Sequence, residues 1–470
     1  MKSHDDLLDK IVSLAKRRGF IYPSSELYGG LANTYDFGPY GTMLKENVRQ
    51  SWLKKFIGDR EDLYPIDSSV IINPLVWEAS GHVSNFADIM VEDKVTKKRY
   101  RADHIIEDFF ARKGEEVKVD GKPVAELSKL IIDNKIKSPD GNEFTQPRKF
   151  NTLFETEIGI ISGEKNTAYL RGEIAQGIFM NYKNIIDSFH PKLPFGIGQT
   201  GKAFRNEITA GKFTFRTLEF DLMEFEYFFD PQKGDWNELF EYWKAQVEEF
   251  ALSLGIHKKS LRWRPHEEFE LSHYSKRTED LEYIFPWGAK EMFAVAYRTD
   301  FDLRNHSEKS GKSLAYVYPD GSKVIPHVIE PTFGLSRAIT VLMMNAYTEE
   351  SLTSIPDDSK EKCRVVMKFP KHLAPVKASV FALQKDEKLQ AIAKDIHNIL
   401  RLNFNCEYQD SGNIGKMYRR QDEIGTPYCI TVDYGSIEDK MVTVRDRDTM
   451  AQERISIEGL ETYLKGNIRI

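Results

Sequence analysis

Two stretches near the start of the chain carry apolar residues at helical spacing. Residues 5–18 present Leu7, Ile11 and Leu14 on one face, and Gly19 follows them. A second stripe, with one apolar residue every four positions, consists of Leu44, Val48, Trp52 and Phe56. The pattern predicts an amphipathic helix over 5–18, then a long helix that ends before Pro65. The segment LYPIDSSVIINP predicts a buried strand that ends at Pro74.

The middle of the chain is dominated by strand-like runs. FGIGQTGKAFRNEI and FTFRTLEFDLMEFEYFF flank a short loop that contains Gly211, so an antiparallel hairpin is predicted. MFAVAYRTDFDL and VIPHVIEP are also strand-like, whereas GLSRAITVLMMNAY has helical spacing. Together these runs predict an α+β fold, in which helices back a mostly antiparallel sheet.

Two changes in composition divide the chain. From about residue 92 to 148 it turns to Lys, Glu and Asp, which indicates an insertion in a main body that covers 1–350. A polar linker with a proline is predicted over 351–361. Beyond it, the strand-like runs CRVVMKFP, CEYQD, YCITVDY and MVTVRDRD alternate with a helix over 385–401 and a final helix. This alternation predicts a separate α/β domain over 362–470.

Composition narrows the class of protein. Of 470 residues, 41% are hydrophobic and 29% are charged, which is an ordinary globular balance. No run approaches the roughly 18 apolar residues of a membrane span, and the first residues do not resemble a secretory leader, so we expect a cytoplasmic protein. The three cysteines, Cys363, Cys406 and Cys429, are too widely spaced for a disulfide framework or a metal knuckle. The net charge of -6 argues against non-specific binding to nucleic acid.

The predicted hairpin carries side chains that suit a nucleotide. Residues two apart share one face of a strand, which groups Arg205 with Glu207 and Arg216 with Phe220 and Glu224. A guanidinium group can hold phosphate, a ring can stack on a base, and an acid can accept from an exocyclic amine. Cross-strand ion pairs on a plain surface would explain the same residues. Spacing alone leaves both interpretations open.

Several motifs carry a resemblance to a known family. The order of helix, strand and Pro74, then FRNE with a following RxxxF, then GLSR before a helix resembles the three signature motifs of class II aminoacyl-tRNA synthetases. More narrowly, the chain resembles glycyl-tRNA synthetases of the α2 dimer type in YGGLANTYDFGPYG, VWEASGH, RGEIAQGIF, KAFRNEIT, RTDFDL, VIEPTFG and YRRQDEIGTP. The resemblance covers nearly the whole chain. It implies a class II catalytic domain over 1–350 and an anticodon-binding domain over 362–470.

The resemblance also implies an activity. Members of the family use ATP to activate glycine as glycyl-adenylate, and then transfer it to the 3' end of tRNA(Gly). Mg²⁺ would bridge the ATP phosphates, with few protein ligands. A homodimer is implied, in which the helix of Trp52 and the strand before Pro74 form much of the interface. Two rivals are a related synthetase for another small amino acid and a non-catalytic protein that binds nucleic acid.

Matched positions imply an ATP site. Arg205 would contact the α-phosphate, Glu207 the adenine amine and Phe220 the adenine ring. Arg205 and Arg337 are the expected catalytic residues, and Arg337 also opens a helix whose N-terminus favours anions, although a plain capping arginine would look the same. The full implied set is Arg205, Asn206, Glu207, Phe215, Arg216, Phe220, Lys290, Glu291, Gly334 and Arg337.

A glycine pocket is implied as well, with Glu173, Glu291 and Glu330 around the ammonium group. The implied set is Arg99, Glu173, Phe220, Glu224, Glu291, Glu330 and Thr332, the last at a usual serine position, where its methyl narrows the pocket against alanine. The frame departs from the family pattern at Gly172, Ile174, Leu218, Ala289, Lys290, Ala294 and Tyr297. Lys290 is a candidate ion-pair partner of Glu291. These departures motivate the rival with a different amino acid.

Two further expectations concern tRNA and metal. GKMYRRQDEIGTP offers Lys416, Tyr418, Arg419 and Arg420 for phosphate contact and base stacking, unless it is an exposed loop balanced by its own acids. Many bacterial relatives carry cysteine pairs in the insertion, whereas this chain has EDKVTKK and KSPDGNEF there, so no zinc is expected. A lone histidine, His82, is expected to be a packed, hydrogen-bonded residue rather than a metal ligand.

Overall fold

The structure is a computed structural model of the 470-residue chain. It describes residues 5–468 except 86, 116, 118, 120–121, 160–165, 208–211, 352–362 and 411. Nearly all of the expected linker and the loop around Gly211 therefore lie outside the described residues.

A seven-stranded sheet forms the centre of the main body, in the order β12-β13-β14-β17-β11-β10-β3. All neighbouring strands are antiparallel except β3, which runs parallel to β10. The bounds are β3 Leu63–Pro65, β10 Phe195–Phe204, β11 Glu219–Phe229, β12 Leu261–Pro265, β13 Arg277–Phe285, β14 Gly288–Thr299 and β17 His327–Gly334. The predicted antiparallel sheet is thus present, and β10 and β11 form the predicted pair.

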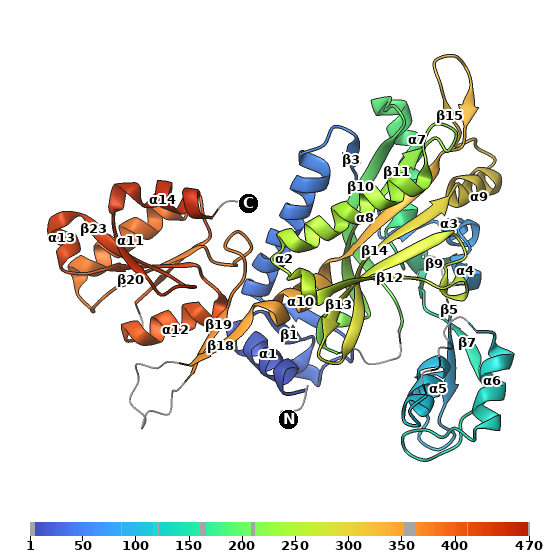
Figure 1. The fold of residues 1–470 in the computed structure, drawn as a ribbon, viewed down its shortest axis with the longest axis horizontal. Helices are drawn as coiled ribbons and strands as arrows, with labels where there is room; N and C mark the ends of the chain where they lie inside the picture. Colours follow the sequence, from blue (N-terminus) through green and yellow to red (C-terminus); the bar gives the residue numbers. More distant parts are fainter. Residues whose placement is uncertain are drawn as a thin grey trace.

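Strict alternation along β11 gives the sheet two different faces. Met223, Phe225 and Tyr227 point into the largest apolar core, whereas Glu224 and Glu226 point to the other side. The apolar face is covered by α2 (Pro39–Leu53), α8 (Trp236–Ser253) and α10 (Leu335–Ala346), and α7 (Ala175–Phe189) packs on β10 and β11 from the opposite side (Figure 1). The polar face of the sheet is therefore enclosed under α7.

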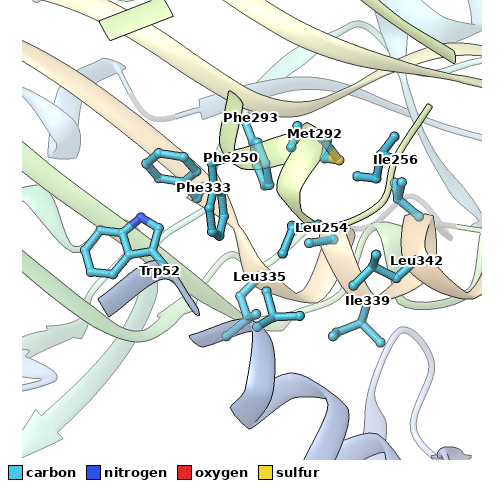
Figure 2. Close-up of a cluster of buried hydrophobic side chains, with 14 of the residues drawn as sticks. Trp52, Phe250, Leu254, Ile256, Met292, Phe293, Phe333, Leu335, Ile339 and Leu342 are labelled. Atoms are coloured by element: carbon cyan, nitrogen blue, oxygen red, sulfur yellow. The ribbon is translucent and has the colours of Figure 1, made fainter. Parts of the chain in front are cut away.

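The predicted apolar stripe lies in this core. Leu44, Val48, Trp52 and Phe56 are at most 1% exposed. Trp52 lies beside Phe333, with ring centroids 5.9 Å apart, and Phe333 is surrounded by further rings (Figure 2). The helix is shorter than predicted, because a π-helical turn over Lys54–Gly58 takes over after Leu53. Since the stripe is buried within its own chain, it is not available for the contact between subunits expected above.

The chain around Pro74 differs from the predicted elements. The expected long strand is split into β3 (Leu63–Pro65) and β4 (Ile71–Ile72), which belong to different sheets, and Pro74 opens α3 (Pro74–Ala79) instead of ending a strand. The Asn73 side chain accepts from the backbone of Leu75, and a proline suits the first turn because no N–H is needed there. The end of MFAVAYRTDFDL is likewise helical, in α9 (Phe301–Ser310). α1 spans Asp5–Arg18, as predicted.

The insertion is a small unit that projects from the main body (Figure 1). It contains the three-stranded sheet β6-β5-β7 and two helices, with bounds β5 Ala87–Glu92, β6 Arg99–Arg101, α5 Ala102–Ala111, α6 Val124–Asp133 and β7 Arg148–Asn151. Asp93 lies at its centre with no exposed surface. Its carboxylate accepts from the Val95 and Thr96 amides at 2.8 and 2.9 Å, and from Ser138 and Asn142 at 2.6 and 3.1 Å.

Shorter elements complete the main body. A second three-stranded sheet has the order β4-β9-β8, with β8 at Phe154–Ile158 and β9 at Asn166–Leu170. The remaining ones are β1 Ile21–Pro23, η1 Glu26–Tyr28, β2 Tyr35–Phe37, α4 His82–Asn85, η3 Phe213–Phe215, η4 Lys258–Ser260, η5 Glu268–Glu270, β15 Tyr316–Val317 and β16 Lys323–Val324. None of the described helices is long and apolar enough to span a membrane.

The C-terminal domain contains a five-stranded sheet, ordered β21-β20-β22-β23-β24. Its bounds are β20 Ala378–Ala382, α11 Glu387–Leu400, β21 Cys406–Gln409, α12 Ile414–Ile424, β22 Tyr428–Val432, α13 Gly435–Asp439, β23 Met441–Asp446, β24 Gln452–Ser456, η6 Ile457–Gly459 and α14 Leu460–Asn467. β19 (Cys363–Met367), predicted as part of this sheet, instead pairs with β18 (Tyr347–Ser351) of the main body. The GKMYRRQDEI segment is α12, not a loop.

Candidate active site

A cleft opens beside β11, β14, β17 and the start of α10. It is lined by most of the residues that the sequence predicted for the ATP and glycine sites. Twelve of them line it: Glu173, Arg205, Glu207, Phe215, Arg216, Phe220, Glu224, Glu291, Glu330, Thr332, Gly334 and Arg337. Asn206, Lys290 and Arg99 do not. The Lys290 side chain is exposed, and Arg99 lies on the insertion, 3.3 Å from Glu92.

Three arginines meet at the outer part of the cleft. The Nε atom of Arg216 lies 3.0 Å from a Glu207 oxygen, and Nη1 of Arg337 lies 2.7 Å from a Glu291 oxygen. Arg205 donates to a backbone carbonyl at 3.0 Å, and its guanidinium carbon lies 5.4 Å from the centre of the Phe220 ring. Glu291 is therefore paired with an arginine and not with Lys290. An aromatic face beside several guanidinium groups is suited to a nucleotide.

The local backbone differs from the sequence prediction here. β10 ends at Phe204, so residues 205–207 are irregular, and Phe213–Phe215 form a 3₁₀ turn instead of a strand. The alternation argument for Arg205 and Glu207 was therefore wrong, although both line the cleft. Backbone hydrogen bonds position them: the amide of Arg205 donates to Leu218, and the amide of Asn206 donates to Thr152, at 2.9 and 2.7 Å.

Glu173 anchors the inner part of the cleft, just before α7. His82 Nε2 lies 3.0 Å from one of its oxygens, and Gln176 donates to the other at 2.9 Å. Burial alone would raise the pKa of Glu173, but His82 and Arg298 outweigh burial and hold that pKa well below its usual value. His82 is buried and also contacts Ser80 at 2.8 Å, as expected for a packed histidine.

The sequence reading missed Arg298, which holds this pocket together. It is completely buried and donates to both oxygens of Asp302, at 2.8 and 3.0 Å, and to Glu330 at 2.8 Å. The ring of Tyr274 lies 3.7 Å from its guanidinium carbon. The sequence does carry a signal for it, because Arg298 is the first residue of RTDFDL, one of the stretches that resemble the family.

Two more acids, Glu224 and Glu226, lie near Glu330 in this pocket. Glu224, Glu226 and Glu330 are buried, and the Thr332 hydroxyl lies 3.1 Å from a Glu224 oxygen and 3.0 Å from a Glu330 oxygen. Burial and the neighbouring carboxylates raise the pKa of Glu224 and Glu226 well above the usual value. Arg298 opposes the same effects at Glu330, whose pKa is still raised. Such a pocket favours a cation.

Other residues of the cleft gave no signal in the sequence. Asp221 is 5% exposed and lies 2.9 Å from Lys45 and 3.3 Å from Arg49, two residues of α2. His266 and Asp280 form a second pair, with Nε2 2.8 Å from a carboxylate oxygen. These pairs join residues far apart in the sequence, so spacing could not have revealed them.

Two of the residues that depart from the family pattern, Ile174 and Tyr297, are well packed. Ile174 is fully buried in a small cluster with Ala203 and Leu222, against which Phe220 packs. Tyr297 stacks on Trp236, with ring centroids 4.6 Å apart, and its hydroxyl lies 2.6 Å from Nδ1 of His327. Ile174 and Tyr297 therefore sit in complementary surroundings, whereas Ala294 lines the cleft beside the acids.

The candidate tRNA residues lie on α12 in different settings. Lys416 is exposed. Tyr418, by contrast, packs against Phe381, its ring lies 4.8 Å from the guanidinium carbon of Arg445, and its hydroxyl bonds with Thr431 at 2.6 Å. Its ring is thus partly packed within the domain, and its contact with tRNA stays a prediction.

Comparisons with known proteins agree with this architecture. The family model described as "Anticodon binding domain" matches residues 377–467, which begins after β19. Among solved structures, two prolyl-tRNA synthetase complexes from Cryptosporidium parvum superpose with TM-scores of 0.62 and 0.60 at 15% and 14% identity, over 98% of this chain and 76% and 78% of theirs. At that identity the likeness shows the fold alone. The fold is that of a class II aminoacyl-tRNA synthetase with a C-terminal anticodon-binding domain.

Full-length relatives identify the family. Glycine–tRNA ligases from Acetivibrio thermocellus and Clostridium acetobutylicum are each 48% identical, over 98% of this chain and 98% and 99% of theirs. The enzyme from Bacillus cereus is 47% identical over 98% of both chains. This chain belongs to the glycine–tRNA ligase family. The resemblance read from the motifs is therefore confirmed.

Proposed function

We propose that this protein is a glycine–tRNA ligase, which activates glycine with ATP and transfers it to the 3' end of tRNA(Gly). The observation that carries the proposal is a single cleft with three arginines and Phe220 at one part and buried acids at the other. An arginine-rich part matches the triphosphate. An acidic part matches the ammonium group of an amino acid, the one charged group of glycine that its reaction leaves untouched.

In the first step, a carboxylate oxygen of glycine attacks the α-phosphorus of ATP, and pyrophosphate leaves. Arg205 neutralises charge on the α-phosphate, while Phe220 stacks on adenine and Glu207 accepts from its amine. Arg216 and Arg337 hold the outer phosphates. Each of these two arginines is paired with a carboxylate, Glu207 or Glu291, so ATP phosphates would replace those partners. Bound Mg²⁺ would supply further charge neutralisation, with most of its ligands from the phosphates.

In the second step, the terminal ribose hydroxyl of the tRNA attacks the activated carbonyl, and AMP leaves. The anticodon-binding domain would select the tRNA, with Lys416, Arg419 and Arg420 as candidate phosphate contacts on α12. The known chemistry needs no nucleophilic side chain. It rests on positioning and on charge. We expect the reaction to take place in the cytoplasm.

We also propose a homodimer. Ile71, Leu75 and Ile158 are 47%, 52% and 48% exposed, and they lie at or beside a groove that Pro74 also lines. An exposed apolar group of this kind favours contact with another protein surface. This surface includes the segment before Pro74, one of the two parts of the interface that the resemblance implies. The apolar stripe of the other part, the Trp52 helix, is buried, so the surface at Pro74 is the better candidate for the interface.

The test is ATP–pyrophosphate exchange on the purified chain, with glycine, alanine, serine and proline supplied separately. Exchange with glycine alone is expected. Arg205→Ala should lower the rate at least about a hundredfold, the size of effect seen when one donor to a developing negative charge is removed. Lys202→Ala is the matched control, because Lys202 lies on the same hairpin, does not line the cleft and pairs with exposed Glu219. Exchange with another amino acid instead of glycine would contradict the proposed substrate.

A further inference from the structure

Three glutamates converge on the sheet face under α7. Glu224 and Glu226 come from β11 and Glu330 from β17; they are 1%, 0% and 7% exposed. One carboxylate oxygen of each lies within 4.8 Å of the others. The strand register pairs Glu224 with Thr332 and Tyr227 with Ile329, which sets Glu226 opposite Glu330. Like charges at opposite positions repel each other, and burial strengthens the repulsion.

The carboxylates of this cluster have too few hydrogen-bond donors around them. The hydroxyl of Thr332 is within reach of both Glu224 and Glu330, but it has one proton to give. Among the described residues, neither carboxylate oxygen of Glu226 has a hydrogen-bond partner. An ionised carboxylate that is buried without a donor is strongly disfavoured, whereas a protonated one supplies its own donor.

The charged groups around Glu226 also favour its protonated form. The charged groups that act on it are Glu224 on its own strand, Glu330 on β17, Arg298 on β14 and Asp302 on α9. His306, also on α9, lies near Asp302 and Arg298. Arg298 already holds both oxygens of Asp302 and one of Glu330. Burial lowers the pKa of His306 to about 4, so its ring is neutral near pH 7. On the α7 side, Gln176 is neutral and bonds with His306 at 2.8 Å. One arginine therefore faces four acids of this set.

We propose that Glu226 holds a proton while the pocket is empty, and releases it to solvent when the ammonium group of glycine docks within this cluster of three glutamates, where its N–H groups supply the donors that the carboxylates lack. The inference rests on the proposed function. The balance is simple: the O–H bond of Glu226 breaks, one proton leaves, and the charge of the ammonium group replaces it. No covalent bond of glycine changes in this step.

The consequence is a link between pH and affinity for the amino acid. If one proton leaves for each glycine that binds, the dissociation constant for glycine falls about tenfold for each unit by which the pH rises, as long as the pH is below the pKa of the cluster. An isosteric Glu226→Gln variant imitates the protonated state but has no proton to release. Its affinity for glycine should therefore vary much less with pH.

The direct test is calorimetric titration of the full-length protein with glycine in two buffers that differ in ionisation enthalpy, because the difference in heat counts the protons released. The wild type should release about one proton, and Glu226→Gln should bind glycine and release almost none. Glu279→Gln is the matched control. Glu279 is also buried on the central sheet, but Lys244 and Arg277 hold it at 2.7 and 2.5 Å, and it does not line the cleft. This control should release as many protons as the wild type.

The outcomes separate this inference from the proposed function. Glycine binding without proton release, or full release by Glu226→Gln, overturns the role of Glu226 and leaves the ligase proposal standing. Absence of glycine binding contradicts the ligase proposal and, with it, the release on docking. If the variant does not fold, infrared spectra of the wild type decide: a carboxylic-acid carbonyl band must weaken when glycine is added, and an unchanged spectrum overturns the inference.

A measurement without glycine tests the held proton itself. Because the pKa of Glu226 is raised above its ordinary value of 4.5, the folded wild type keeps a proton that the unfolded chain loses as the pH rises. The wild type should therefore lose stability relative to Glu226→Gln between about pH 5 and the pKa of the folded state. Melting temperatures of the two proteins across this range should diverge. A constant difference overturns the inference.

Discussion

Thr332 and Arg298 determine most of the electrostatics of the inner pocket. Thr332 bridges Glu224 and Glu330 through one hydroxyl, and Arg298 holds the second oxygen of Glu330. These two contacts fix the orientation of the carboxylates before any substrate arrives. Fixed groups need no rearrangement when a charged ligand binds, which is the general advantage of a preorganised site.

Substitution of Thr332 tests this role of the hydroxyl. Thr332→Val keeps the shape but removes the donor, so we expect the KM for glycine to rise about tenfold, equivalent to about 1.4 kcal/mol, with a smaller change in kcat. Thr332→Ser keeps the hydroxyl and should stay within about twofold of the wild type for glycine. Because it removes a methyl group from the pocket wall, it should also raise activity with alanine. Exchange assays over a range of glycine and alanine concentrations measure both effects. An unchanged KM in Thr332→Val would rule out the bridge.

At the residue scale, the sequence predicted the side chains that lie within motifs and missed those that act across the fold. Arg205, Phe220 and Glu330 could be assigned because each stands in a short recognisable stretch. Asp221 and His266 could not be, because their partners lie on other elements and only the folded chain brings them together. For the same reason the sequence did not reveal that the Tyr418 ring contacts Arg445 and Phe381.

At the scale of elements, prediction succeeded where one hydrophobic period runs unbroken. α1, α10 and the pair β10–β11 follow from such periods. It failed where the period changes inside a segment, as after Leu53, and where polar segments form helices because they pack on a partner, as in α12. Local propensity could not have revealed that β19 pairs with β18, since that choice depends on which strand edges are free once the body has folded.

The insertion offers a test at this scale, because Asp93 joins two turns that are distant in sequence. Asp93→Ala leaves the amides of Val95 and Thr96 without their acceptor and separates them from Ser138. We expect limited proteolysis to cut the insertion roughly tenfold faster, since cleavage follows the population of the opened form. Asp140→Ala is the control, because Asp140 is exposed and pairs with Lys98 at the surface. A metal chelator should leave the cleavage rate of the wild type unchanged, and an acceleration by the chelator would contradict the expectation that no zinc is bound.

At the scale of the whole molecule, the two domains are joined through a shared core. Phe20 of the main body and Phe369 and Ile424 beyond the linker belong to one buried cluster, and the two rings lie 6.0 Å apart. Arg18 of α1 bonds with Glu423 of α12 at 2.5 Å. The C-terminal domain therefore packs against the body through apolar and charged contacts, so α12 is held in a defined position relative to the cleft.

The proposed dimer is the prediction that involves the whole molecule. Ile71 and Leu75 leave about half of their surface exposed beside the groove at Pro74. If the partner covers them, replacing both by Asp should raise the dimer dissociation constant at least about a hundredfold, because each buried side chain of this size contributes roughly 1.5–3 kcal/mol. Sedimentation velocity at micromolar concentration should then detect monomer for this variant and dimer for the wild type. Leu402→Asp is the control, since Leu402 is 78% exposed on the C-terminal domain and should leave the dimer intact. A monomeric wild type would contradict the dimer itself, whereas a dimeric Ile71→Asp, Leu75→Asp variant would contradict only this choice of interface.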